Sequence, residues 1–353
     1  EAAEAAADLI VADLPAFLPC DPVSEGEAAC AAAFVRAFGR RAFRRPLTDA
    51  EAARYDAHYA ELAAEDGFAA ALRWVSAAIL QSPGFLYRTE LGRADGQGAY
   101  ALTPHELAAE LSYLIVGAPP DAELSALADD GALADPDVLV AQAERLLASP
   151  ESERVLHRFA DEWLMIRRLP IVTRDPALFP ELTPEIRDAM LGETRRVFGA
   201  LFRGGGTFAD LLTSSATYLT PALAAYYGEA LGGGAPDPAG FVPAARTKGA
   251  GAGVLVHGAL LTTHALPTSS SPIHRGLVVR ERLLCQHMPP PPPSVNASPP
   301  PVDPALSTRE RYAQHSEDPT CAGCHKLIDP IGFAFERFDA VGRWRDQDGV
   351  HPI

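Results

Sequence analysis

The sequence TPEIRDAMLGETRRVFGALFRGGG, residues 183–206, carries the clearest helix signals in the chain. Thr183 is a helix-capping residue, and Pro184 at the first helical position has no amide hydrogen to leave unsatisfied. Apolar residues recur at helical spacing on one face, namely Ile186, Met190, Val197, Phe198 and Leu201. Three glycines at 204–206 then end the helix, because glycine is a poor helix former. The stretch predicts an amphipathic core helix.

The same kind of pattern extends through the N-terminal part of the chain. Thr48 with Glu51, and Thr103 with Glu106, are capping-box pairs, which mark helix starts. Further apolar periodicity predicts helices over 27–45, 48–65, 68–81, 121–130, 136–148, 151–168, 254–266 and 275–286. No convincing run of alternating strand residues is found, so the first 230 residues are predicted to form an all-helical bundle.

We therefore expect a mainly α fold, with helical bundle domains followed by a small C-terminal module that contains a proline-rich segment. The expected domains are an N-terminal helical region at 1–98, a central helical bundle at 99–231, a Gly/Pro-rich linker at 232–253 and the module at 254–353. Residues 289–304 are proline-rich and include five consecutive prolines at 289–293. Such a run favours an extended polyproline II path, either on the surface or as a solvated linker.

Composition and charge exclude several classes of protein. The 353 residues include 30 Lys+Arg and 46 Asp+Glu, which gives a formal net charge of −16 and argues against a nucleic-acid groove. A content of 48% hydrophobic and 22% charged residues is typical of a globular protein. No stretch approaches the roughly 20 apolar residues that a membrane span needs.

The most specific motif is Cys321-Ala322-Gly323-Cys324-His325, a Cys-x-x-Cys-His sequence. This is the attachment signature of c-type haem. Two thiols at this spacing can form thioethers with the two vinyl groups of one haem, and the adjacent His325 can donate an imidazole nitrogen to the iron. The motif predicts one covalently attached haem c, with Cys321 and Cys324 as attachment points and His325 as the proximal ligand.

Two other interpretations of the cysteine pair are open. A zinc site would need two further ligands, which Cys285 and His287 could supply. A thioredoxin-like redox pair would need a strand followed by a helix, a context that the flanking sequence lacks.

The predicted haem also bears on the compartment. The chain begins without a basic segment followed by a long apolar one, so it is either cytosolic or a mature form whose targeting peptide has been removed. Bacteria attach haem c outside the cytoplasm, which favours a periplasmic or extracellular protein. Cys20 and Cys30 could then form a disulfide, and Cys285 has no assigned role. The residues up to Ile353 contain no stop or capping signal, and we expect a fragment of a longer protein.

The distal haem ligand is less defined. No Met follows His325, so a distal ligand must come mostly from upstream. His315 and Met288 are the leading candidates, and His264 and His274 are further ones. An open sixth position is the other possibility, and it would allow the iron to bind peroxide or oxygen. Two arginines just after the motif, Arg343 and Arg345, are candidates for binding the haem propionates.

The segments around the motif resemble the planctomycete-type cytochrome c domain proteins, a group of exported proteins of planctomycetes and myxobacteria. The most specific resemblance lies within 268–345, in TSSSPIHRG, RLLCQHMPPPPP, CAGCH and IDPIGF. FGRRAFRRPLT at 38–48 resembles the small N-terminal helical domain of this group. SPGFLYR at 82–88 and LAAYYG at 223–228 resemble its central domain of unknown function. The resemblance implies a covalent haem and export but no substrate, and it implies a further C-terminal domain beyond this chain. It also marks His315 as a recurrent position, which ranks His315 above Met288.

Three functions are compatible with the sequence. The first is electron transfer by a c-type cytochrome, whose acidic surface would select a positively charged redox partner protein. The second is a haem enzyme, such as a peroxidase or oxygenase, with an open sixth position. The third is a structural protein of the envelope or exterior, in which the haem acts as a staple. Whether the chain is an enzyme stays undecided at this point.

Overall fold

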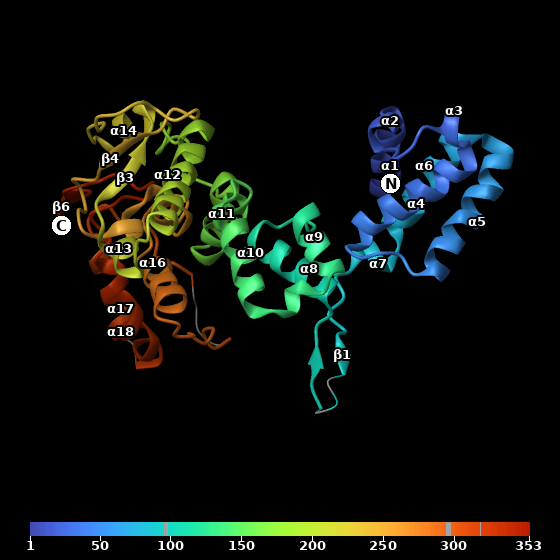
Figure 1. The fold of residues 1–353 in the computed structure, drawn as a ribbon. Helices are drawn as coiled ribbons and strands as arrows, with labels where there is room; N and C mark the ends of the chain where they lie inside the picture. The colour runs from blue at the N-terminus through green and yellow to red at the C-terminus, as the bar shows by residue number, and fades with distance from the viewer. Residues whose placement is uncertain (95, 97, 294–297, 318) are drawn as a thin grey trace. The chain divides into compact units, whose positions relative to one another are not determined.

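The computed structural model describes residues 1–353 except 95, 97, 294–297 and 318, and the side chains of 314–320 also lie outside the description. The chain is mainly helical, as predicted, and small two-stranded sheets complete it (Figure 1). It divides into two compact units, Glu1–Val155 and Leu156–Ile353, which are described separately. None of the helices in the described part of the chain is long and apolar enough to cross a membrane.

Unit 1 begins with helices packed around α6. Their bounds are α1 (Ala2–Ala12), α2 (Leu14–Phe17), α3 (Pro22–Glu25), α4 (Glu27–Phe43), α5 (Asp49–Asp66), α6 (Phe68–Gln81) and α7 (Pro83–Leu86). Phe34 of α4 and Leu72, Val75 and Ile79 of α6 have no exposed surface and form the core. The predicted capping box is confirmed, because the Thr48 side chain accepts from the amide of Glu51 and the Glu51 carboxylate accepts from the amide of Thr48.

The second half of unit 1 forms a separate apolar cluster. It contains β1 (Arg93–Ala94), β2 (Tyr100–Ala101), α8 (Pro104–Ile115), α9 (Ala122–Asp129), the 3-10 helix η1 (Ala132–Ala134) and α10 (Pro136–Ala148). Leu124, Leu133 and Leu146 are buried at its centre. A salt bridge of 2.7 Å between Arg40 of α4 and Asp129 of α9 joins the two halves.

The next helix, α11 (Ser152–Trp163), is shorter than the predicted 151–168, and a 3-10 helix, η2 (Ile166–Ile171), follows it.

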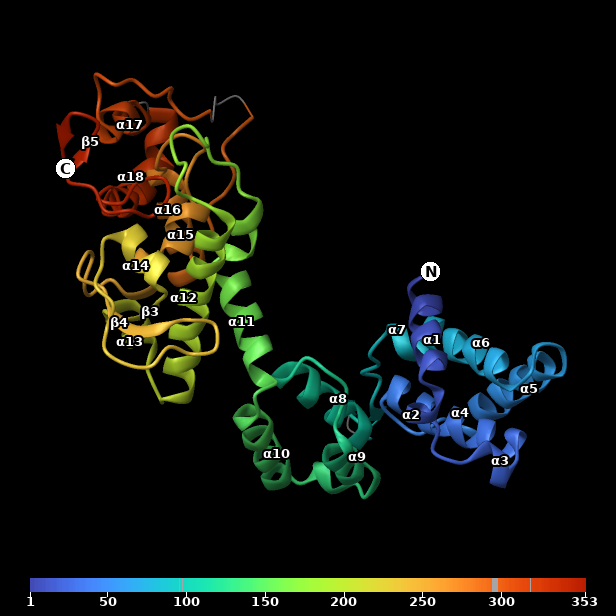
Figure 2. The same ribbon diagram turned by 90° about the horizontal axis from the view of Figure 1, so that it is seen from above.

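Unit 2 is built around α12 (Pro184–Arg203), which confirms the helix predicted from the 183–206 stretch. Met190, Val197 and Phe198 of α12 are buried in the largest apolar cluster of the described chain. The surrounding elements are α13 (Phe208–Thr213), β3 (Ala216–Leu219), α14 (Pro221–Tyr227), β4 (Val242–Ala245), the 3-10 helix η3 (Gly253–Val256) and α15 (Gly258–Thr263) (Figure 2).

The β3–β4 pair differs from the sequence expectation. The strands are antiparallel, with Ala216 opposite Ala245 and Leu219 opposite Val242. Part of the segment 232–253, which we expected to be a linker, is therefore packed into unit 2, and Phe241 beside β4 is buried. The prediction that the first 230 residues are all helical was wrong at β3 and at the β1–β2 hairpin.

The C-terminal elements of unit 2 are α16 (Pro272–Val278), the π-helix η4 (Val279–Leu283), α17 (Thr308–Glu317), α18 (Pro319–Phe333), β5 (Gln347–Asp348) and β6 (His351–Pro352). Helices α16 and α18 cross at backbone contact through two glycines. A Cβ built on Gly276 would lie 2.4 Å from the carbonyl oxygen of Ile328, and one on Gly332 would lie 1.9 Å from that of Pro272. Only glycine therefore fits at either position.

Alanine at either glycine should destabilise unit 2, because the added methyl group overlaps a carbonyl that cannot move without its helix. We expect G276A and G332A each to lower the free energy of unfolding by about 2 kcal/mol or more. Gly323→Ala on α18 is the control, because a Cβ there meets no atom within 4 Å. Urea unfolding followed by circular dichroism measures the difference, and equal stability of G323A and G332A would contradict the close crossing.

The predicted disulfide is present and joins Cys20 to Cys30 of α4. It closes a short loop and restricts the unfolded chain, so its removal should cost about 2–3 kcal/mol of the stability of unit 1. The double variant C20A/C30A should show this loss in thermal unfolding, whereas C285A, at an exposed free cysteine, should behave like the wild type. An unfolding curve that does not change when the wild type is reduced would exclude a stabilising disulfide.

Candidate haem-attachment site

Helix α18 presents the Cys-x-x-Cys-His motif. Cys321 and Cys324 are half-buried free thiols, and His325 is half-buried beside them. Residues three and four apart lie on one face of a helix, so Cys321 shares a face with both Cys324 and His325. Gly323 between the two cysteines is exposed, and the space around its Cα is open. Two thiols and an imidazole on one accessible face are the arrangement that a covalent haem needs.

The imidazole of His325 is oriented by a carboxylate of the same helix. Nδ1–H of His325 donates to Asp329, at 3.0 Å from Oδ1 and 3.2 Å from Oδ2. The Asp329 side chain is only 3% exposed. Because a carboxylate only accepts, the hydrogen of the neutral ring lies on Nδ1 and the lone pair on Nε2. Nε2 with a lone pair is the atom that ligates iron, so the residues present fit a haem with His325 as its axial ligand.

Sequence analysis did not assign this role to Asp329. The spacing of four residues after His325 was the available signal, because it places both side chains on one helical face. The zinc alternative receives no support in the described part of the chain, where no group of three or more His, Cys, Asp or Glu residues could hold a metal ion.

The candidate distal ligands have different surroundings. His315 is on α17, and its side chain lies outside the described residues. Met288 is half-buried in the irregular segment after η4. His264 is buried, and its Nε2–H donates to the carbonyl oxygen of Leu164 at 3.0 Å. His274 is exposed on α16. Because Nε2 of His264 already has a backbone partner, His315 and Met288 stay the leading predictions.

The two arginines proposed for the propionates are engaged by carboxylates of the chain itself. Arg343 pairs with Asp339 at 2.9 Å, and Arg345 pairs with Glu336 at 2.7 Å. Each also contacts a second carboxylate, on Glu181 and Asp348 respectively. A haem propionate would have to compete with these ion pairs, so propionate binding by Arg343 and Arg345 stays a prediction.

The chain after α18 is held by Arg275, a side chain without exposed surface. Its guanidinium donates to the carbonyl oxygens of Phe335 at 3.1 Å, Phe338 at 2.7 Å and Leu261 at 3.3 Å, and also to that of Asp339. Burial lowers the pKa of Arg275 to about 10, which leaves it charged at neutral pH. Arg275 occurs in the TSSSPIHRG segment, but sequence alone does not indicate that its partners are backbone carbonyls.

A buried polar network lies elsewhere in unit 2, centred on the Glu193 carboxylate of α12. Glu193 accepts from Thr217 at 2.8 Å, from Tyr227 at 3.0 Å and from Arg246 at 3.2 Å. Nε2 of His257 lies 4.0 Å from the same carboxylate, and burial lowers the pKa of His257. All five side chains are buried, so this network joins β3, α14, the residue after β4 and the N-cap residue of α15 to α12.

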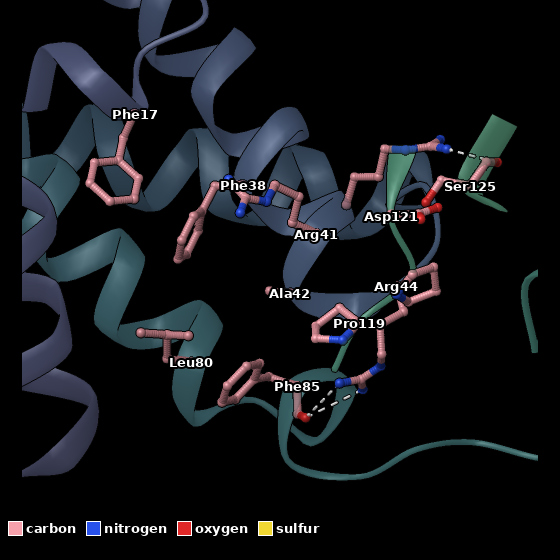
Figure 3. A pocket seen from close by; sticks show the side chains of 12 residues that line it. Phe17, Phe38, Arg41, Ala42, Arg44, Leu80, Phe85, Pro119, Asp121 and Ser125 are labelled. Carbon is pink, nitrogen blue, oxygen red and sulfur yellow. Dashed lines mark hydrogen bonds between the residues drawn. The ribbon is translucent and has the colours of Figure 1, made fainter. Parts of the chain in front are cut away.

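Unit 1 contains a cavity of about 440 Å³ (Figure 3). Its walls are mostly apolar, with Phe17, Phe38, Leu80, Phe85 and Pro119 among the lining residues. Three arginines of α4 and its C-terminus also line it. Arg40 is paired with Asp129, and Arg44 donates to backbone carbonyls of Gly84 and Tyr87, so both have structural partners. Arg41 is exposed.

Helix α18 thus presents the Cys-x-x-Cys-His motif on one face, with the buried carboxylate of Asp329 beside the histidine. Three family models match the chain: PSD5, a protein of unknown function (DUF1595), at 30–90; PSD4, a protein of unknown function (DUF1592), at 102–228; and PSCyt3, a protein of unknown function (DUF1588), at 251–348. The chain belongs to the planctomycete-type cytochrome c domain proteins, which confirms the resemblance seen in the sequence. No curated protein and no solved structure shows a significant match to it.

The buried histidines make unit 2 sensitive to acid. Burial lowers the pKa of His264 to about 4, below the 6.5 of an exposed histidine, so protons bind the unfolded state more readily. Neutral His264 therefore contributes to the free energy of unfolding, and this contribution is fully present above pH 6.5. As the pH falls towards 4, the free energy of unfolding should decrease by up to about 3 kcal/mol. Denaturant unfolding across this range should show the loss, and H264Q should have a flatter pH profile. Parallel profiles for wild type and H264Q would contradict this assignment.

Proposed function

We propose that the protein is an exported c-type cytochrome that carries one haem on α18 and transfers electrons to or from a protein partner. The observation that carries the proposal is the shared helical face of Cys321, Cys324 and His325, with Nδ1 of His325 fixed by Asp329. The match of PSCyt3 to residues 251–348 supports assigning the haem to the module that we expect at 254–353.

Each residue of the site has a distinct role in this proposal. The Cys321 and Cys324 thiols would hold the haem through two thioether bonds, and Nε2 of His325 would be its proximal ligand. The close crossing of α16 and α18 at Gly276 and Gly332 holds the helix that presents them. When bound, the haem supplies a one-electron carrier that protein side chains do not offer. His315, or else Met288, would complete the coordination of the iron for electron transfer.

The proposed compartment and partner follow from two further observations. The Cys20–Cys30 disulfide supports export, since structural disulfides persist in oxidising environments such as the periplasm and the exterior. A net charge of −16 favours a positively charged redox partner and predicts an association rate that falls with salt.

One observation favours a second function, a haem enzyme with an open sixth position. A carboxylate hydrogen-bonded to a ligating histidine raises the basicity of the ligand, and an electron-rich ligand favours chemistry at the iron. The His325–Asp329 pair has this arrangement. The scaffold function, with the haem as a staple, has no comparable observation in its favour.

Mass spectrometry and absorption spectroscopy test the proposal. The peptide that contains residues 321–325 should carry one haem, and C321A/C324A should lose it, whereas C285A should keep it. A low-spin spectrum that carbon monoxide and cyanide leave unchanged supports electron transfer, and a high-spin ferric spectrum supports the enzyme. H315A and M288A, compared in the same assay, identify the distal ligand. A wild-type peptide without haem would exclude both functions.

A further inference from the structure

We infer that Asp329 is a positioning residue that sets the orientation and the donor strength of His325, and thereby gives the haem iron a low reduction potential. This inference rests on the proposed haem attachment at α18. It assigns a role to a carboxylate that the Cys-x-x-Cys-His motif does not include.

The geometry of Asp329 favours a fixed partnership with His325. Both residues are on α18 and four positions apart, so the helix itself sets their separation. Both carboxylate oxygens lie within hydrogen-bond distance of Nδ1, at 3.0 and 3.2 Å. A rotation of the carboxylate therefore exchanges one acceptor for the other without releasing the ring.

Burial makes this interaction strong. The Asp329 side chain is 3% exposed, so little water screens its charge from the imidazole. On the opposite helix Tyr312 is also buried, and its pKa is raised first by burial and in smaller part by the charges of Glu336 and Asp329. Asp329 thus lies in a poorly solvated layer between α17 and α18, where water screens its negative charge less than at the surface.

Contacts with α16 fix the backbone of α18 on both sides of Asp329. Ile328, the residue before Asp329, has its carbonyl oxygen against Gly276 of α16, and Gly332 is in contact with the carbonyl of Pro272. The turn of α18 that contains Asp329 is thus held between two backbone contacts. These contacts fix the backbone of α18 on either side of Asp329 against α16.

The consequence concerns the electron density that His325 provides. A carboxylate that accepts from Nδ1–H draws the hydrogen and makes Nε2 a stronger donor, as outer-shell carboxylates do for metal-bound histidines in general. Stronger donation stabilises the more oxidised iron and lowers its reduction potential. A neutral acceptor at the same place would lower the reduction potential less, because a hydrogen bond to a charged group is roughly twice as strong as one between neutral groups.

Spectroelectrochemical titration of the haem-loaded full chain tests the inference. D329N keeps an oxygen acceptor but removes the charge, and D329A removes both. The midpoint potential should rise from wild type to D329N and rise further in D329A. D188N is the matched control: Asp188 of α12 is an exposed carboxylate in the same unit without a hydrogen bond or ion pair to any described residue, and its variant should keep the wild-type potential.

A second measurement needs no haem and no variant of Asp329. Long-range ¹H–¹⁵N correlation spectra of the haem-free wild-type chain report which ring nitrogen of His325 carries the hydrogen, with H325Q to assign the signals. The hydrogen should be on Nδ1 when the ring is neutral. A neutral ring with the hydrogen on Nε2 would overturn the inference, even if the Asp329 variants fail to fold.

The outcomes separate this inference from the proposed function. A chain that carries haem, with equal potentials in wild type, D329N and D188N, overturns the role of Asp329 and leaves the cytochrome proposal intact. A chain without haem on residues 321–325 overturns both. A rise in potential confined to the Asp329 variants, with the hydrogen on Nδ1, supports the inference.

Discussion

The arrangement of α16, α18 and the chain that follows α18 depends on the burial of one guanidinium, that of Arg275. A buried charge is costly unless hydrogen bonds replace its water, and here four backbone carbonyls do so. Three of these carbonyls belong to the segment from Phe335 to Asp339, directly after α18. The next residue of α16, Gly276, lies against the carbonyl of Ile328 within α18. Two adjacent residues thus fix both the helix that carries the motif and the chain that leaves it.

This constraint links the structure to the proposed chemistry. Cys321, Cys324 and His325 lie in the first turns of α18, whereas the contacts with α16 lie in its last turns. The face that carries the motif can therefore stay accessible while the other end of the helix is packed against α16. Asp329 lies between these regions, since its side chain is buried with the packed end and accepts a hydrogen bond from His325 of the accessible end.

The sequence predicted those elements whose signals are local. Helices α5, α8 and α12 begin at the predicted capping residues, because a cap and an apolar stripe are contained within a few turns. The β3–β4 pair escaped prediction, since each strand has four residues and its partner is remote in sequence. The Cys-x-x-Cys-His motif is recognised from its spacing alone, and haem attachment at Cys321, Cys324 and His325 stays a prediction. The hydrogen bonds of Arg275 to backbone carbonyls, and the ion pairs of Arg343 and Arg345, depend on tertiary packing that no local pattern encodes.

The α16–α18 crossing also restricts how this module can diverge. The atom that each glycine approaches is a main-chain oxygen, which every residue type possesses. A smaller neighbouring side chain cannot compensate for a substitution at Gly276, nor can one for Gly332. The two positions should therefore be invariant independently rather than covary, and a homologue that lacks either glycine should have a different angle between these helices. Such a homologue would orient α18 differently within the unit, even with an unchanged motif.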